Sequence, residues 1–135
     1  MNTPIEKFKA LNVRVKFYCI LGAVLVVAGI ILGSLELTLA YQRSAFEEKA
    51  DALVEAKAKE VMTKINTKSY KIEKEFGSID NALYYTVTFD KYKPAEISAG
   101  YMPTYLWDIF FDYTPVLVKR FYINSNNPVL ELLTE

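Results

Sequence analysis

The strongest constraint on the fold is an apolar run from Phe17 to Tyr41, whose first nineteen residues, through Leu35, carry no charge. At a rise of 1.5 Å per residue, nineteen helical residues span about 28 Å, which is close to the hydrocarbon thickness of a bilayer. A helix buried inside a soluble domain is seldom this long. The run therefore predicts a transmembrane helix over residues 17–41.

The residues before this run set the orientation that we expect. Residues 1–16 form a basic tail with one acid, Glu6, against four bases: Lys7, Lys9, Arg14 and Lys16. Such a tail stays on the cytoplasmic or matrix-like side, either as a flexible segment or as a short amphipathic helix on anionic lipid. A cleaved secretory signal competes with this interpretation, but its apolar core should be only about 7–15 residues long.

We therefore expect an uncleaved signal anchor in a single-pass, integral membrane protein. The N-terminus is then cytoplasmic and everything after residue 41 is extracytoplasmic. A bacterial inner membrane is preferred to an organelle membrane.

Small residues in the run fall on one side of the predicted helix. At about 100° per residue, the small residues Gly22, Gly29, Gly33 and Ala40 and the carboxylate Glu36 lie within about 40° of a common line. The two later glycines form a G-x-x-x-G pair, a spacing that lets another helix approach backbone to backbone. This side of the helix is the predicted packing face.

Glu36, the only carboxylate of the run, allows two interpretations. In the first, it lies at the outer headgroup level and simply reaches water. In the second, it belongs to the packing face and either pairs with a cation of a neighbouring subunit or serves an ion or proton path, because acids inside membranes are costly.

Residues 42–66 predict an amphipathic juxtamembrane helix, although a break near Gln42 stays open. Pairs Glu55–Lys59 and Glu60–Lys64 have the favourable i,i+4 order. The apolar positions follow a helical period, at 46, 50, 53, 54, 58, 61, 62 and 65. This stripe could cover a partner helix or the membrane surface, but packing on the chain's own distal domain is the default expectation, since a small domain needs apolar surface.

Residues 67–135 predict a small extracytoplasmic, β-rich domain. Alternation of apolar and polar residues indicates strands over residues 70–76 and 83–89, and the Gly77–Asn81 segment has turn chemistry, which together predict an antiparallel hairpin. Residues 90–103 contain Pro94, Gly100 and Pro103, which predict an irregular connection.

Two further strands are expected at the end of the chain. Apolar residues at 116, 118, 121 and 123 and the mostly apolar residues 129–133 flank an Asn-rich turn that ends at Pro128. The expected fold class is α+β: one transmembrane helix continues into an amphipathic helix, followed by a small antiparallel sheet of about four strands and a short aromatic-rich helix.

Residues 105–113, YLWDIFFDY, predict that short helix, with Thr104 as a plausible N-cap, although a strand stays open as the alternative. Asp108 and Asp112 lie four residues apart, which favours a solvated face over a catalytic or calcium site, because no calcium-loop spacing accompanies them. The aromatic remainder could pack in the core. It could also contact a partner or the membrane interface, through Tyr105, Trp107, Phe110 and Phe111.

The segments VLVKRFYINSNNPVLELL and YYTVTFD resemble a widespread family of small membrane-associated β-domain proteins of uncharacterised function. The first is similar to that family's closing hairpin and the second to its central strand. The resemblance covers the chain from about Val61 or Ser69 to Leu133, but Tyr113–Pro115 replaces the family's usual Gly-Asp pair and YLWDIFFDY has no counterpart. It implies a compact, β-rich extracytoplasmic module and carries over no catalytic residues.

Composition excludes several functions. The chain has no histidine, which removes His-dependent triads, most zinc sites and His-ligated haem. Its single cysteine, Cys19, lies in the apolar run, and sixteen bases balance sixteen acids, which gives no support to nucleic-acid binding. We expect neither a cofactor nor a metal, and we expect no enzymatic activity.

The function predicted from sequence is that of an accessory or structural subunit of a membrane protein complex. The partners would be other membrane-protein subunits, or a second copy of the chain, together with membrane lipid. The alternative is a membrane-anchored periplasmic or luminal module that senses or binds a ligand.

Overall fold

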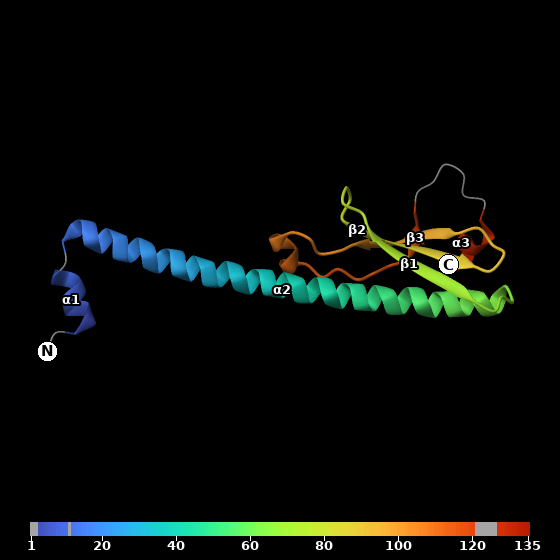
Figure 1. The fold of residues 1–135 in the computed structure, drawn as a ribbon, viewed down its shortest axis with the longest axis horizontal. Helices are drawn as coiled ribbons and strands as arrows, with labels where there is room; N and C mark the ends of the chain where they lie inside the picture. Colours follow the sequence, from blue (N-terminus) through green and yellow to red (C-terminus); the bar gives the residue numbers. More distant parts are fainter. Residues whose placement is uncertain (1–2, 11, 121–126) are drawn as a thin grey trace. The chain divides into compact units, whose positions relative to one another are not determined.

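The computed structural model describes residues 3–10, 12–120 and 127–135, which form an α+β fold (Figure 1). A long N-terminal helix precedes a four-stranded antiparallel sheet. The chain divides into two compact units, Met1–Leu37 and Thr38–Glu135. In chain order the elements are α1 (Pro4–Ala10), α2 (Val13–Lys64), β1 (Tyr70–Phe76), β2 (Ala82–Phe89), β3 (Ala95–Tyr101), the 3-10 helix η1 (Leu106–Phe110), β4 (Val118–Lys119) and α3 (Pro128–Leu133).

The N-terminal tail is helical rather than flexible over Pro4–Ala10. A reciprocal cap explains why: the Thr3 amide donates to Glu6 Oε2 (3.1 Å) and the Glu6 amide donates to Thr3 Oγ1 (3.2 Å). Asn12 then begins the next helix, because its side-chain oxygen accepts from the Val15 amide at 2.9 Å. The tail is therefore helical over this range, and its contact with anionic lipid stays a prediction.

Helix α2 runs without a break through Gln42 to Lys64, so the apolar run and the charged segment after it are one helix. Asn66 follows with a positive φ of 55°, a left-handed conformation that ends helices when no glycine or proline is present. Both expected i,i+4 ion pairs form, Glu55–Lys59 at 3.6 Å and Glu60–Lys64 at 3.2 Å.

The charged part of α2 packs its apolar stripe on the distal domain, as expected by default. Figure 1 shows the green part of the helix running along the sheet. The core contains five residues of this stripe together with the inward side chains of β2 and β3 and part of α3. The five are Phe46, Ala50, Val54, Ala58 and Val61, all buried.

The sheet has the order β1-β2-β3-β4, with every neighbouring pair antiparallel. The predicted first hairpin is confirmed: Tyr70 pairs with Phe89 and Phe76 pairs with Leu83. Leu83, Tyr85, Val87 and Phe89 are buried, as the alternation predicts.

Two expectations about the sheet are wrong. Residues 95–101 were expected to be irregular but form β3, which pairs with β2 through a bulge at Leu83/Tyr84; small side chains and Gly100 hide this strand's pattern. Residues 129–133 were expected to be a strand but belong to helix α3, because Asn127 caps it and Pro128 occupies its first turn. Of the other expected closing strand, only Val118–Lys119 is a strand, and residues 121–126 lie outside the described residues.

Candidate functional site: the aromatic loop

The aromatic loop, residues 102–113, is organised around the buried carboxylate of Asp108. Its Oδ2 atom accepts from the Thr104 amide and the Tyr105 amide, both at 2.9 Å, and from the Tyr101 hydroxyl at 2.6 Å. Its Oδ1 atom accepts from the Tyr113 hydroxyl at 3.0 Å. Four donors therefore satisfy one carboxylate, which fixes both ends of the loop to η1.

These hydrogen bonds also settle the ionisation of Asp108. Burial alone would raise the pKa of its carboxyl, but the hydrogen bonds from Tyr101, the two amides and Tyr113 together outweigh burial and lower that pKa. The pKa of the Tyr101 hydroxyl rises to about 12, first because of burial and then because it donates to Asp108. Asp108 is thus a saturated structural anion, and the expectation that it faces solvent is wrong; Asp112 does face solvent.

Although the Asp108 carboxylate is turned inward, the loop presents its aromatic side chains outward. The four residues predicted as contacts are all exposed: Tyr105 45%, Trp107 61%, Phe110 78% and Phe111 58%. Tyr105 and Trp107 stack on each other, with ring centroids 4.6 Å apart. The structure therefore brings all four together on one short loop, and packing in the core, which was the alternative, is wrong for them.

The loop is attached to the start of the charged part of α2. Gln42 Nε2 donates to the Ile109 carbonyl at 3.1 Å. A small depression of about 120 Å³ lies beside this bond, with Phe111 and Tyr113 on one side and Tyr41 and Phe46 on the other. Gln42 immediately follows Tyr41, the last residue of the apolar run, so the loop sits where that run ends.

A second polar cluster joins the sheet to α2. The Tyr85 hydroxyl donates to Asp51 Oδ1 at 2.5 Å, and Lys74 Nζ lies 3.2 Å from Asp51 Oδ2 and also bonds Glu47. Burial, followed by the bond to Asp51, raises the pKa of the Tyr85 hydroxyl far above its usual value. Because the Tyr85 hydroxyl stays neutral and the Lys74 amine stays charged, neither group exchanges a proton near neutral pH. The cluster is therefore a structural contact rather than a pair for acid–base catalysis.

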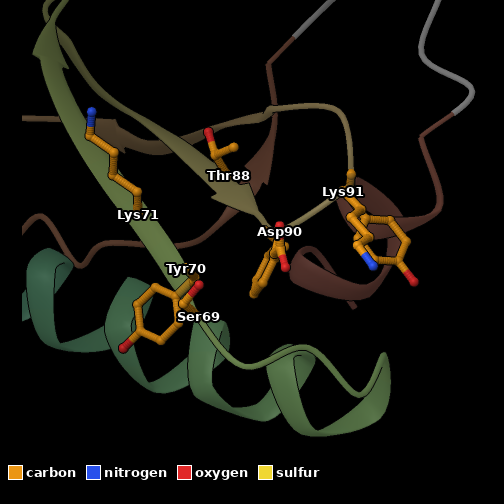
Figure 2. A pocket seen from close by; sticks show the side chains of 8 residues that line it. Ser69, Tyr70, Lys71, Thr88, Asp90 and Lys91 are labelled. Atoms are coloured by element: carbon orange, nitrogen blue, oxygen red, sulfur yellow. The ribbon is translucent and has the colours of Figure 1, made fainter.

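A depression of about 360 Å³ lies at the end of the β1–β2 hairpin opposite its turn, and Figure 2 shows the side chains that line it. Lys71 and Lys91 lie on different sides of it, and Asp90 lies between them, so its charged groups do not converge on one point (Figure 2). Within the described ranges, no three His, Cys, Asp or Glu side chains come together to hold a metal ion.

The predicted packing face lies in the first part of α2. A methyl group built on Gly22, Gly29 or Gly33 would meet nothing within 4 Å, and Glu36 is exposed. Across the described part of the chain, α2 is the one helix long and apolar enough to cross a membrane, and none of its most apolar window is buried.

The chain matches no protein-family model, no curated protein and no solved structure. The resemblance of residues 61–133 to small membrane-associated β-domain proteins therefore stays a prediction. Sequence reasoning found the aromatic residues of the loop but missed the role of Asp108. The sequence did carry a signal for this role, because Tyr101 and Tyr113 lie on either side of Asp108 in an apolar segment.

Proposed function

We propose that the protein is a non-enzymatic, single-pass membrane protein that serves as an accessory or structural subunit of a membrane complex. The observation that carries this proposal is the uncovered apolar part of α2. Nineteen consecutive uncharged residues, from Phe17 to Leu35, include no buried side chain. Such an extent of apolar surface needs a non-aqueous environment or a partner.

The N-terminus lies on the cytoplasmic side in this proposal. Lys7 and Lys9 belong to α1, and Arg14 and Lys16 to the first turn of α2, so the bases flank one end of the apolar segment. Translocating them would oppose the bias that keeps lysine and arginine inside. The distal domain, residues 67–135, is then extracytoplasmic, and a bacterial inner membrane is the simplest location.

Assembly uses the glycine side of the helix. With no side chain near Gly29 or Gly33, a second helix can approach the backbone, and van der Waals contact replaces lipid. Glu36 lies on the same side and would pair with a cation of the neighbouring subunit. The partners are other membrane-protein subunits or a second copy of the chain.

The absence of enzymatic activity is proposed from how the polar groups are used. Asp108 is saturated by four donors, and Asp51 is occupied by Tyr85 and Lys74. These groups hold elements of the fold together, whereas catalytic groups usually lie in a cleft where they can meet a substrate.

The test is assembly in native membranes. We expect gently extracted protein to migrate with stoichiometric partners on blue-native gels, and Gly29→Leu or Gly33→Leu to abolish that species. The matched control is Ala28→Leu, which adds similar bulk about 120° away from the glycine line. A monomer that is indifferent to both glycine changes contradicts the proposal, as does equal disruption by the control.

Glu36→Gln separates the two roles of that residue. If Glu36 pairs with a neighbouring cation, the variant weakens the complex in the same gels while the anchor persists. Unchanged assembly and unchanged ion or proton dependence would return Glu36 to a carboxylate that simply reaches water.

A further inference from the structure

Three segments meet at the end of the distal domain where α2 enters it. The aromatic loop contacts α2 through the Gln42–Ile109 hydrogen bond. The β1–β2 turn, residues 77–81, contacts the loop twice: the Met102 amide donates to the Asn81 carbonyl at 2.9 Å, and Asn81 Nδ2 lies 3.3 Å from the Tyr105 hydroxyl. Figure 1 shows this turn and η1 at the same end of the sheet.

This end of the domain is unusually apolar for a surface. The most exposed large apolar side chain of the described residues, Ile79, stands at the tip of the turn at 98% exposure. Tyr105, Trp107, Phe110 and Phe111 add their rings from the loop. We name these five residues the apical patch. Exposed apolar clusters of this kind on a small domain mark an interaction site.

The edge of the apical patch carries charges of both signs: the exposed Asp80 follows Ile79 in the turn, and the exposed Asp112 follows Phe111 in the loop. The loop's Asp108 is withdrawn into the interior, so its negative charge does not face outward. A cation lies at the same edge, since the Arg43 guanidinium is over the Phe76 ring, 5.3 Å from its centroid, at the start of the same turn. Arginine beside aromatic rings at a membrane boundary can pair with lipid phosphate.

We infer that the apical patch rests in the headgroup layer of a phospholipid bilayer and holds the distal domain against the membrane. The place of the patch in the chain favours lipid over a protein partner. The Ile109 carbonyl of the loop accepts a hydrogen bond from Gln42, and Gln42 is the residue that follows the apolar run. Tryptophan and tyrosine concentrate at this depth of membrane proteins, with their rings in the apolar layer and their polar atoms in the wet one.

This inference rests on the proposed membrane anchor, and the chain itself supplies separate reporters for the two. Trp107 is the only tryptophan and belongs to the patch, whereas Cys19 is the only cysteine and belongs to the apolar run. A fluorophore on Cys19 therefore reports the anchor and the indole reports the patch, within one full-length protein.

The experiment places the full chain in vesicles of phosphatidylcholine and phosphatidylglycerol, with or without lipids brominated near the top of the acyl chain. We expect Trp107 emission to be blue-shifted and to lose about half its intensity to the brominated lipids, as for an indole at headgroup level. Phe110→Asp should reduce this quenching roughly twofold by removing the most exposed ring of the patch. Tyr92→Ser, at the opposite end of β2, is the matched control and should leave the quenching unchanged.

Each other outcome overturns the inference in a recognisable way. A fluorophore on Cys19 that lipids do not quench shows that the anchor fails, and the inference fails with it. If Cys19 reports lipid but Trp107 emits as in water, the anchor stands and the patch does not touch the membrane. A blue-shifted Trp107 that brominated lipids do not quench means that protein covers the patch instead.

Discussion

The two parts of α2 differ in what covers their apolar side chains, although they belong to one helix. Residues 13–37 include no buried side chain, whereas five residues between Phe46 and Val61 are buried by the chain's own sheet and by α3. The amphipathic part finds its cover within the protein. The uniformly apolar part has none among the described residues, and in the proposed membrane anchor its cover comes from lipid and from other helices.

The largest effect that tests this comparison comes from placing the same acid in each part. Val54→Asp puts a carboxylate where the side chain is fully buried, and we expect the distal domain to lose more than about 4 kcal/mol of stability. Val26→Asp should leave the domain's melting temperature unchanged and instead cost about 3 kcal/mol of membrane insertion. Circular dichroism in detergent and carbonate extraction of membranes measure the two effects; equal loss of domain stability in both variants would contradict the comparison.

Removing the carboxylate at the centre of the aromatic loop should have the next largest effect. Asp108→Ala leaves four donors without an acceptor, and we expect a loss of about 3 kcal/mol in the free energy of unfolding. Asp112→Ala is the matched control, because that side chain is exposed, and it should change stability by less than about 0.5 kcal/mol. Similar values for the two variants in urea titrations would show that Asp108 does not organise the loop.

The same hydrogen bonds predict a pH dependence. Since the pKa of Asp108 is lowered from 3.8, its stabilisation is present above that pH and is lost as the pH falls further. Since the pKa of Tyr101 rises from 10.0 to about 12, its stabilisation is present below pH 10.0 and is lost as the pH rises through 12. We expect the melting temperature of the domain to be flat between these limits and to fall on both sides.

Single variants show which residue causes the fall of the melting temperature at acid pH and which causes the fall at alkaline pH. Asp108→Asn should reduce the loss of stability at acid pH, and Tyr101→Phe should reduce the loss at alkaline pH, to which the buried Tyr85 hydroxyl also contributes. If Asp108→Asn does not change the fall of the melting temperature at acid pH, other carboxyl groups cause that fall. Asp108 would then not stabilise the domain in the way that its hydrogen bonds indicate.

A smaller effect is expected where the sheet is fastened to α2. Tyr85→Phe removes a hydrogen bond to the Asp51 carboxylate and should cost about 1.5 kcal/mol. Glu55→Ala breaks only an exposed pair with Lys59 and should cost less than about 0.5 kcal/mol. Thermal unfolding that ranks the two variants in the reverse order would show that the Asp51 cluster does not secure the contact.

The sequence predicted an element correctly wherever apolar residues recurred at one regular spacing along its whole length. The helical stripe from Phe46 to Val61 and the alternation from Leu83 to Phe89 both predicted their element and its buried face. The exposed aromatic residues of the loop were also identified from sequence. Each of these features is encoded within a few neighbouring residues.

The missed features depend on partners that are distant in sequence or on single capping residues. Strand β3 is mostly Ala, Ser and Gly near its centre, and only its pairing with β2 makes it a strand. Helix α3 is apolar in the manner of a strand, and Asn127 and Pro128 alone mark it as helical. The role of Asp108 needs Tyr101 and Tyr113, which only the folded loop brings to it.

The most direct test of the central claim is whether the apolar part of α2 is shielded by lipid. In a Cys19→Ser background, Val26→Cys and Ser69→Cys place one thiol in the apolar part and one on the exposed surface of the domain. An impermeant maleimide is added to vesicles opened by a pore-forming toxin, so that it reaches both aqueous sides. We expect Ser69→Cys to react at once and Val26→Cys to react only after solubilisation in SDS. Equal and immediate reaction of both thiols would show that the apolar part of α2 is not shielded.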